Sequence, residues 1–339
     1  MAITINGQER RIGLALSGGG FRAAAFHLGV MRKLQSLELF SSIDLLSCVS
    51  GGSIAGAFVA LNWGSDTVLD ELENYLATRS IAVSSVIGGI LDPFESRLDK
   101  LAKTYDRDLF QGARLSGLRS GPRIYINATN LSTGNMFFFV AGGAGPEEMG
   151  EHELGVVPGP DFSLARAVAA SSAFPPVFPP LRLESFEYGP AAQVDYVTLT
   201  DGGVYDNMGV NPALRTRNAL DYLIVSDGGK PFANTEQPTE SGGLVLKESL
   251  GIMMEQIRGL EFDRMEHRHK AGAGPRPLWF SIDSVTGQAQ PGDAQFASSI
   301  STNLSALNAA ERAVLVRHGG ALVEARIQAY APELLLPTT

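Results

Sequence analysis

The sequence predicts an α/β fold in which helices cover a mainly parallel sheet. Twice within the first 61 residues, a short apolar run leads through a glycine-rich turn into a segment with helical spacing. Strand–turn–helix units repeated in this way favour parallel strands joined by helical connections. The chain has 339 residues, of which 44% are hydrophobic, which is enough for one large domain or two smaller ones. Its 38 glycines indicate many tight turns.

The two repeated units lie at the start of the chain. Residues 11–16 form an apolar run typical of a strand buried on both faces, and residues 21–37 follow with apolar side chains at helical spacing. Residues 43–49 give a second buried strand, and residues 53–61 give a helix of small residues. A third helix is expected over residues 68–76, because Ser65 and Asp66 before it are typical helix caps.

The middle of the chain contains a predicted strand pair and a short helix. Residues 123–129 and 135–140 are rich in β-branched and aromatic side chains and flank a polar, glycine-containing turn. Residues 142–160 are rich in glycine and proline, so we expect irregular surface there. Residues 164–172 form a helix that ends before two Pro-Pro pairs. The apolar segment 80–92 fits either a mobile flap or a core helix.

The rest of the chain continues the alternation of strands and helices. The expected elements are strands over 194–200, 222–226 and 278–282, and helices over 244–268 and 309–330. Residues 231–243 are linker-like, and the helix that follows them has a mixed-charge face. Neither an internal repeat nor a clear domain boundary is evident. We therefore expect a single domain over residues 1–339, in which 230–339 adds helices and strands of unassigned role.

Charge and cysteine content narrow the class of protein. The net charge is −9 and no basic run is present, which argues against nucleic-acid binding because phosphate contacts need clustered Lys and Arg. The single cysteine, Cys48, rules out an intrachain disulfide, so an oxidising compartment is not required. The first eleven residues lack an apolar signal core, and Asp44, serines and glycines interrupt the apolar stretch 43–63. We expect a cytoplasmic protein without a transmembrane helix.

The first glycine-rich turn has the sequence GGGFR, from Gly18 to Arg22, between a strand and a helix. Its backbone N–H groups and the positive end of the helix dipole suit the binding of an anion, including an oxyanion. Arg22 would steady the loop or the anion. Two alternatives remain open at this point. Gly18-x-Gly20-x-x-Ala23 followed by Asp44 also fits a dinucleotide fingerprint, and the turn also fits a structural role without a ligand.

The second turn suggests a nucleophile elbow centred on Ser50. The elbow pattern G-x-S-x-G needs small residues two before and two after the serine, so that strand and helix pack closely. Here the run is CVSGG, and Cys48 replaces the first glycine. Ser47 would lie in the strand and Ser53 in the helix, which leaves Ser50 at the exposed apex. Cys48 itself is expected to be a buried packing thiol rather than a nucleophile.

A base for this serine is sought first among the five histidines. They are His27, His152, His267, His269 and His318, and none follows a strand end, so a Ser-His-Asp triad is not favoured. Two aspartates do end strands, Asp201 and Asp227, each within the sequence Asp-Gly-Gly. A carboxylate hydrogen-bonded to a serine hydroxyl can serve as its base. The turns alone do not distinguish the two aspartates.

Taken together, these motifs resemble those of the patatin-like phospholipase family. The family carries a G-G-G-x-R oxyanion motif, a G-x-S-x-G elbow and a D-G-G/A motif whose aspartate completes a Ser-Asp dyad. Asn207 and Asn211-Pro212 after Asp201 are similar to the family's continuation, which favours Asp201 over Asp227. The segment ASSAFPPVFPP at 170–180 resembles the family's segment before that aspartate. The four motifs occur in the family's order within residues 12–212.

The resemblance implies a three-layer α/β/α sandwich and hydrolysis of lipid acyl esters without metal or nucleotide. Ser50 would attack the ester carbonyl with Asp201 as base. The loop of Gly18, Gly19 and Gly20 would form the oxyanion hole, with help from Gly51 and with Arg22 supporting the loop. The expected activity is of the phospholipase A, lysophospholipase or carboxylesterase type.

Partners and alternatives follow from the same residues. The expected partner is a lipid or acyl-ester substrate, with peripheral membrane contact. Residues 80–92 and 136–140 are candidates to line an acyl pocket, although buried core is the simpler interpretation of both. The alternative function is a catalytically weak or silent lipid-binding or regulatory relative, because Cys48 departs from the elbow pattern. A nucleotide-binding enzyme is the remaining alternative.

Overall fold

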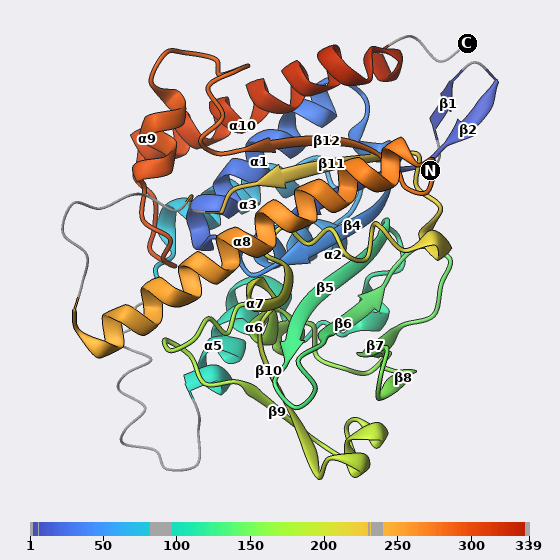
Figure 1. Cartoon of the computed structure of the whole chain (residues 1–339), viewed down its shortest axis with the longest axis vertical. Helices are drawn as coiled ribbons and strands as arrows, with labels where there is room; N and C mark the ends of the chain where they lie inside the picture. Colours follow the sequence, from blue (N-terminus) through green and yellow to red (C-terminus); the bar gives the residue numbers. More distant parts are fainter. Residues whose placement is uncertain (1–2, 6, 82–96, 230, 232–239, 336–339) are drawn as a thin grey trace.

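The computed structural model describes residues 3–5, 7–81, 97–229, 231 and 240–335 (Figure 1). A mixed sheet forms its centre, and its strands are β3 (Ile12–Leu16), β4 (Ile43–Val49), β5 (Arg123–Asn130), β6 (Met136–Ala141), β7 (Glu148–Glu151), β8 (Gly155–Pro158), β9 (Leu181–Glu184), β10 (Tyr196–Asp201), β11 (Tyr222–Asp227) and β12 (Arg276–Ser281). A separate hairpin pairs β1 (Ile3–Ile5) with β2 (Gln8–Arg10).

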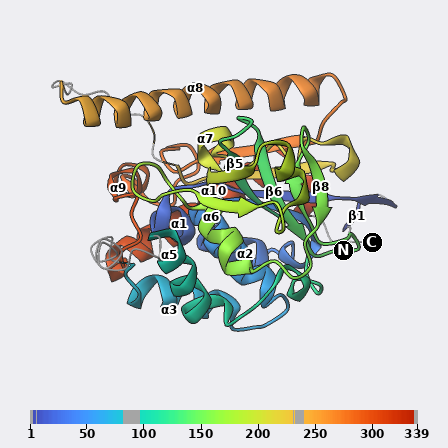
Figure 2. The same ribbon diagram turned by 90° about the horizontal axis from the view of Figure 1, so that it is seen from below.

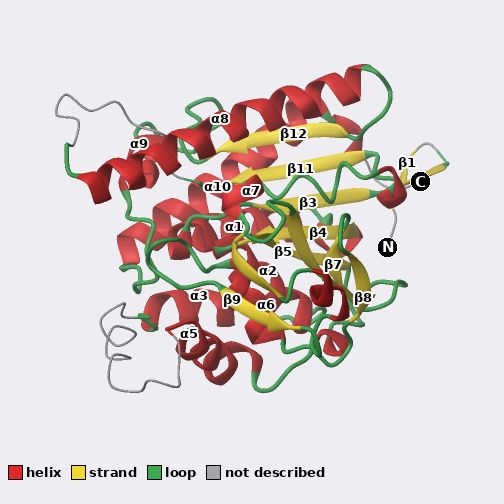
Figure 3. Cartoon of the chain, turned by 60° about the horizontal axis from the view of Figure 1, so that its bottom comes forward, coloured by secondary structure: helices red, strands yellow, loops and turns green. Residues whose placement is uncertain are grey.

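The strand order of the sheet is β12-β11-β3-β4-β5-β6-β7-β8, and β10 pairs with both β5 and β9 (Figure 3). The first five strands in this order are parallel, and the other pairings are antiparallel. Carboxyl ends of adjacent parallel strands share one edge of a sheet, where open α/β sheets place their sites. The turns that follow β3, β4 and β11 therefore lie side by side.

Helices cover both faces of the sheet. They are α1 (Gly20–Ser36), α2 (Gly51–Leu61), α3 (Val68–Thr78), α5 (Arg97–Tyr105), α6 (Leu164–Ser171), α7 (Gly203–Asp206), α8 (Gly242–Lys270), α9 (Asp293–Ser299) and α10 (Ala309–Tyr330). Shorter helical turns lie at Phe40–Ser42, Asp106–Phe110, Leu115–Gly117, Gly189–Gln193, Thr216–Asn218 and Pro332–Leu335. Figure 2 shows α8 on one side of the sheet and α1, α2, α3, α5 and α6 on the other.

Two apolar cores correspond to the two faces. The larger core joins α1, α2, α3, α5, α6 and α10 to the sheet, and the smaller one lies under α8, where Met265 and Phe262 pack on the strands. The predicted three-layer arrangement is confirmed. The part of the chain beyond residue 230 contributes β12 at one edge of the sheet, α10 in the larger core and α8 over the smaller core.

Most of the predicted elements are present. The clearest difference between prediction and structure lies in residues 142–160. This segment was expected to be irregular surface, but it contains β7 and β8, which extend the sheet. A Cβ on Gly150 would lie 2.3 Å from the carbonyl oxygen of Gly155, so glycine here permits close strand pairing rather than a loop. The expected linker 231–243 and the segment 80–92 lie largely outside the described residues.

Candidate active site

Ser50 occupies a strained turn between β4 and α2. Its φ is 51° and its ψ is −116°, a conformation that non-glycine residues rarely adopt. The helix begins at the next residue, so the turn reverses the chain sharply and leaves the half-buried serine at its apex. Its backbone N–H donates to Ser171 Oγ at 3.0 Å, which holds the turn in place. Backbone strain of this kind persists where a site requires it.

Cys48 fits the elbow because a second glycine lies opposite it. The cysteine is fully buried, and a Cβ on Gly56, one turn into α2, would lie 2.4 Å from its Sγ. Two residues after Ser50, where the elbow pattern also needs a small residue, a Cβ on Gly52 would lie 2.2 Å from the carbonyl oxygen of Leu16. Burial raises the pKa of the Cys48 thiol, which keeps it protonated and unreactive. Gly56 thus supplies the space that the missing glycine would have given.

The two glycine-rich turns meet directly beside Ser50. A Cβ on Gly51 would lie 2.2 Å from the carbonyl oxygen of Gly20, so the first residues of α1 and α2 are in backbone contact. The N–H groups of Gly19, Gly20 and Gly51 have no hydrogen-bond partner among the described residues. Two helix N-termini therefore converge here with free donors, which is a favourable place for negative charge.

Gly18 has a different role from that expected. Its N–H donates to the carbonyl oxygen of Asn207 at 3.0 Å and so does not serve as an oxyanion donor. A Cβ at this position would lie 2.4 Å from Asn207 Oδ1 and 3.2 Å from Ser50 Cβ. Gly18 therefore contributes the space that lets the Asn207 carboxamide and Ser50 approach each other. Sequence spacing gave no sign of this use of its N–H.

Asp201 ends β10 and is 1% exposed. Its Oδ1 accepts the Gly203 N–H at 2.7 Å, whereas its Oδ2 is buried without a partner that satisfies hydrogen-bond geometry. Burial raises the pKa of Asp201 to about 7, against the opposing effects of the Gly203 N–H and the nearby Ser50 hydroxyl. Ser50 is thus close enough to stabilise the charged carboxylate, although no aligned hydrogen bond joins the two.

One segment before β10 holds both residues, a role that sequence reasoning missed. Ser171 Oγ accepts the Ser50 N–H and donates to the carbonyl oxygen of Asn127 at 2.6 Å. The Ser171 carbonyl oxygen accepts the Gly202 N–H, and the Ala173 carbonyl oxygen accepts the Asp201 N–H, both at 3.2 Å. The segment had been noted only for its resemblance to a family motif, and its function as a clamp depends on the fold.

Asp227 differs from Asp201 in the partner of its second carboxylate oxygen. It is also 1% exposed, but its Oδ2 accepts a hydrogen bond from Arg258 Nε of α8 at 2.6 Å. Arg22 lies near the same turn: its fully buried guanidinium donates to the carbonyl oxygens of Gly228 and Ile300. Burial lowers the pKa of Arg22 to about 10. Arg22 therefore ties α1 to two loops.

The histidines and the dinucleotide alternative do not fit this site. In the described residues, no histidine hydrogen-bonds Ser50 or Asp201, and His27 is buried between Ser226 Oγ at 2.7 Å and the Ser17 carbonyl oxygen at 2.9 Å. Burial lowers the pKa of His27 to about 4, so it stays neutral. Asp44 accepts the Ile12 N–H at the amino ends of the strands, the edge away from the glycine turn. It is therefore misplaced for a nucleotide ribose.

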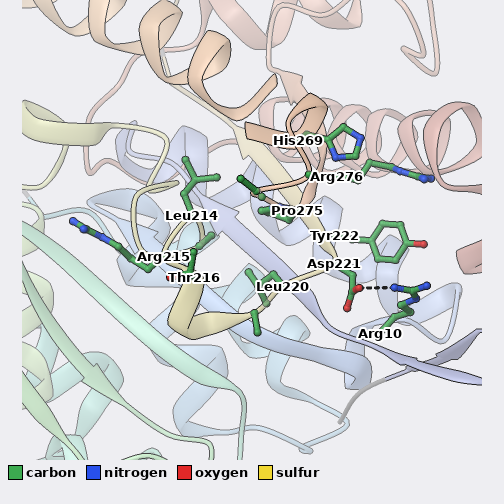
Figure 4. Close-up of a pocket in the computed structure, with 15 residues that line it drawn as sticks. Arg10, Leu214, Arg215, Thr216, Leu220, Asp221, Tyr222, His269, Pro275 and Arg276 are labelled. Atoms are coloured by element: carbon green, nitrogen blue, oxygen red, sulfur yellow. Dashed lines mark hydrogen bonds and ion pairs between the residues drawn. The ribbon is translucent and has the colours of Figure 1, made fainter. Parts of the chain in front are cut away.

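Two cavities lie away from Ser50 and Asp201. One of about 530 Å³ lies at the amino ends of β11 and β12, where Tyr222 and Arg276 begin those strands (Figure 4). Another of about 260 Å³ is lined by Met136 and Phe138, two of the expected acyl-pocket residues, but not by Ser50 or Asp201. Neither cavity therefore supplies an acyl pocket next to Ser50.

Over the residues that the structure describes, no group of three or more His, Cys, Asp or Glu side chains is placed to hold a metal ion. Over the same ranges, no helix is both long and apolar enough to cross a membrane.

The chain is similar to known proteins both in family and in fold. The family model described as Patatin-like phospholipase matches residues 14–214. Human GIVD cytosolic phospholipase A2 is similar in structure, with a TM-score of 0.60 and 14% identity over 96% of this chain and 60% of that chain. The same human protein in complex with methyl gamma-linolenyl fluorophosphonate inhibitor and terbium chloride gives a TM-score of 0.58 and 16% identity. There the match covers 96% of this chain and 59% of that chain. No curated protein matched the sequence.

Proposed function

Because this chain belongs to the patatin-like phospholipase family, we propose that it hydrolyses acyl esters of lipids with Ser50 as nucleophile and Asp201 as base. One observation carries the proposal. Ser50 lies on a strained turn where two helix N-termini meet, beside a buried carboxyl whose Oδ2 has no partner. Perturbed, unpartnered titratable groups of this kind cluster at functional sites. The whole activity is a proposal, since the chain spans 59–60% of the human structures it resembles.

Asp201 would activate the serine. In its ionised form it accepts the Ser50 hydroxyl proton while Oγ attacks the ester carbonyl carbon. A carboxyl with its pKa raised to about 7 is a stronger base than an ordinary aspartate, and it is still substantially ionised near neutral pH. Burial therefore supplies the basicity that a histidine supplies in other serine hydrolases.

The tetrahedral intermediate carries a negative oxygen that the glycine turns would stabilise. We expect the free N–H groups of Gly19, Gly20 and Gly51 to be the donors to this oxygen, with the positive ends of α1 and α2 adding to their effect. Gly18 provides space, and Arg22 fixes the loop. Loss of one such donor typically costs about 10²–10³-fold in kcat.

Collapse of this intermediate completes the first half of the reaction. Protonated Asp201 gives its proton to the departing alcohol, which leaves an acyl ester on Ser50. Water then attacks that ester while Asp201 takes a proton from it, and Asp201 returns this proton to Ser50 Oγ as the fatty acid leaves, which restores the serine and the carboxylate. The proposal includes phospholipase A, lysophospholipase and carboxylesterase activities, a cytoplasmic location and peripheral contact with membranes. It needs neither a metal nor a nucleotide.

The alternative of a silent lipid-binding relative depended on Cys48. Its close fit against Gly56 supports a normally packed elbow and so favours the active enzyme. The test is a comparison of purified protein with Ser50→Ala on short aryl esters, lysophospholipids and phospholipids, together with labelling by a fluorophosphonate probe. We expect hydrolysis and labelling of the unmodified protein only. Hydrolysis retained by Ser50→Ala would overturn the dyad, and lipid binding without any hydrolysis would favour the silent relative.

A further inference from the structure

The outward side of α8 is apolar over its first five turns. Figure 2 shows this helix along one face of the molecule, with its outer side toward solvent. The side chains that we call the outer stripe of α8 are between 41% and 68% exposed and are Val245, Leu246, Ile252, Met253 and Leu260. Their spacing of seven and eight residues places them on one helix face. Ser249 and Gln256, which complete that face, are uncharged.

This helix departs from the usual arrangement, because apolar side chains lie on both its inner and its outer side. A helix on a protein surface normally turns apolar side chains inward and charged ones outward. Here the inner side makes charged contacts with the body of the protein. Arg258 binds Asp227 at 2.6 Å, Arg264 binds Asn211 at 2.7 Å, and Met254 and Phe262 pack beside them. The outer stripe is thus an uncharged apolar surface with no covering element among the described residues.

The same helix segment contacts the candidate active site. Met254 Cε lies 3.3 Å from the position that a Cβ on Gly203 would take, two residues after Asp201. Arg258, one turn later, holds the other Asp-Gly-Gly turn. Met253 faces outward next to Met254, so the outer stripe and the Asp201 turn are separated by about one helix diameter, roughly 10 Å. A surface that receives the stripe therefore lies on the other side of α8 from the Asp201 turn, roughly 10 Å away.

We propose that the outer stripe of α8 docks on the surface of zwitterionic phospholipid and so presents the dyad to aggregated substrate. This proposal rests on the proposed function, which supplies a lipid substrate that resides in such surfaces. Apolar side chains on one helix face bind the boundary between headgroups and acyl chains. The net charge of −9 and the uncharged stripe oppose attraction to anionic lipid, so zwitterionic surfaces are the favoured partner.

The test uses the full chain with Ser50→Ala, which leaves the vesicles intact during binding. The α8 pair adds Leu246→Glu and Met253→Glu to this Ser50→Ala protein. The matched control pair adds Leu131→Glu and Phe186→Glu, which change two exposed apolar residues outside α8. Sedimentation with phosphatidylcholine vesicles should show at least tenfold weaker binding for the α8 pair only. Equal binding by both pairs, or no binding by Ser50→Ala alone, would overturn the proposal.

Activity and molecular mass separate the remaining outcomes. With Ser50 intact, the α8 pair should keep its kcat/KM for a soluble aryl ester and lose at least tenfold on vesicle lipid. A change from dimer to monomer by light scattering would assign the stripe to a second copy of the chain and overturn the lipid assignment. Vesicle binding that depends on α8, in a protein that hydrolyses no ester, would support docking while refuting the proposed function.

Discussion

Two turns in this protein have the same sequence, Asp-Gly-Gly, and different chemistry. Asp201 and Asp227 each end a strand, each is 1% exposed, and each accepts the N–H of the residue two positions later, at 2.7 Å and 3.1 Å. The difference lies in the second carboxylate oxygen. Asp227 Oδ2 accepts a hydrogen bond from Arg258, whereas Asp201 Oδ2 is buried without a partner.

This difference teaches that charge compensation, rather than local sequence, separates a structural carboxylate from a candidate base. A buried carboxylate paired with an arginine is held ionised and acts as a tie between elements. A buried carboxylate without such a partner holds its proton more tightly, which is the property that proton transfer needs. The fold supplies Arg258 from α8 to one turn and Ser50 to the other.

The largest expected effect separates the two aspartates by activity. Asp201→Asn and Ser50→Ala should each lower kcat for a soluble aryl ester by at least about 10³-fold, because each removes a partner of the proton transfer. Asp227→Asn should keep kcat within about tenfold, since Asp227 ties α8 to the sheet edge. Steady-state kinetics on purified, folded variants checks this. Comparable losses for both asparagine variants would refute the assignment of Asp201.

The second prediction concerns pH and sharpens the same contrast. The pKa of Asp201 is raised to about 7 in the folded protein, so kcat/KM should fall about tenfold for each pH unit below 7 as the base is protonated. In the unfolded chain the same carboxyl has an ordinary, lower value. The native state therefore retains a proton that the unfolded state releases between about pH 4 and pH 7, and stability falls as pH rises through that window.

Asp201→Asn removes the ionisable carboxyl and therefore this loss of stability at higher pH. Relative to the unmodified protein, it should be more stable at pH 8 by up to about 4 kcal/mol, and the difference should vanish below about pH 4. Asp227→Asn, which breaks an ion pair, should be less stable than the unmodified protein at pH 8. Urea unfolding at the two pH values measures both. Destabilisation by Asp201→Asn at pH 8 would contradict the uncompensated charge.

A third prediction concerns the loss of Arg258, the cation that pairs with the Asp227 carboxylate. Arg258→Met leaves Asp227 buried without its cation, so the free energy of unfolding at pH 8 should fall by about 3 kcal/mol. Arg264→Met on the same helix is the matched control, because its side chain is more exposed, 39% against 19%. The control should cost about 1 kcal/mol or less. Equal losses would show that Arg258 acts only through packing.

The sequence predicts much of this site because its signals are local. The strand at 43–49 and the helix at 309–330 have the predicted bounds. The turn at Ser50 lies where the elbow pattern places it. The family resemblance favours Asp201 over Asp227, but the ion pair that distinguishes the two carboxylates physically is not local, since Arg258 comes from a distant helix. The use of the Gly18 N–H by Asn207 and the fit of Cys48 against Gly56 also arise only in the folded chain.

The smallest expected effect tests the clamp that distinguishes the Asp201 turn. Ser171→Ala leaves the Ser50 N–H without its acceptor and loosens the elbow, so kcat should fall about tenfold while KM for a soluble ester changes little. Ser172→Ala is the matched control: its hydroxyl is also buried, but it donates to the Val168 carbonyl oxygen of α6 and lies 3.2 Å from the Tyr105 hydroxyl instead of holding the Ser50 turn. The control should retain kcat within about twofold. If the two variants lost activity equally, general packing of α6 rather than positioning of Ser50 would explain the effect, and the clamp would have no special role in the proposed chemistry.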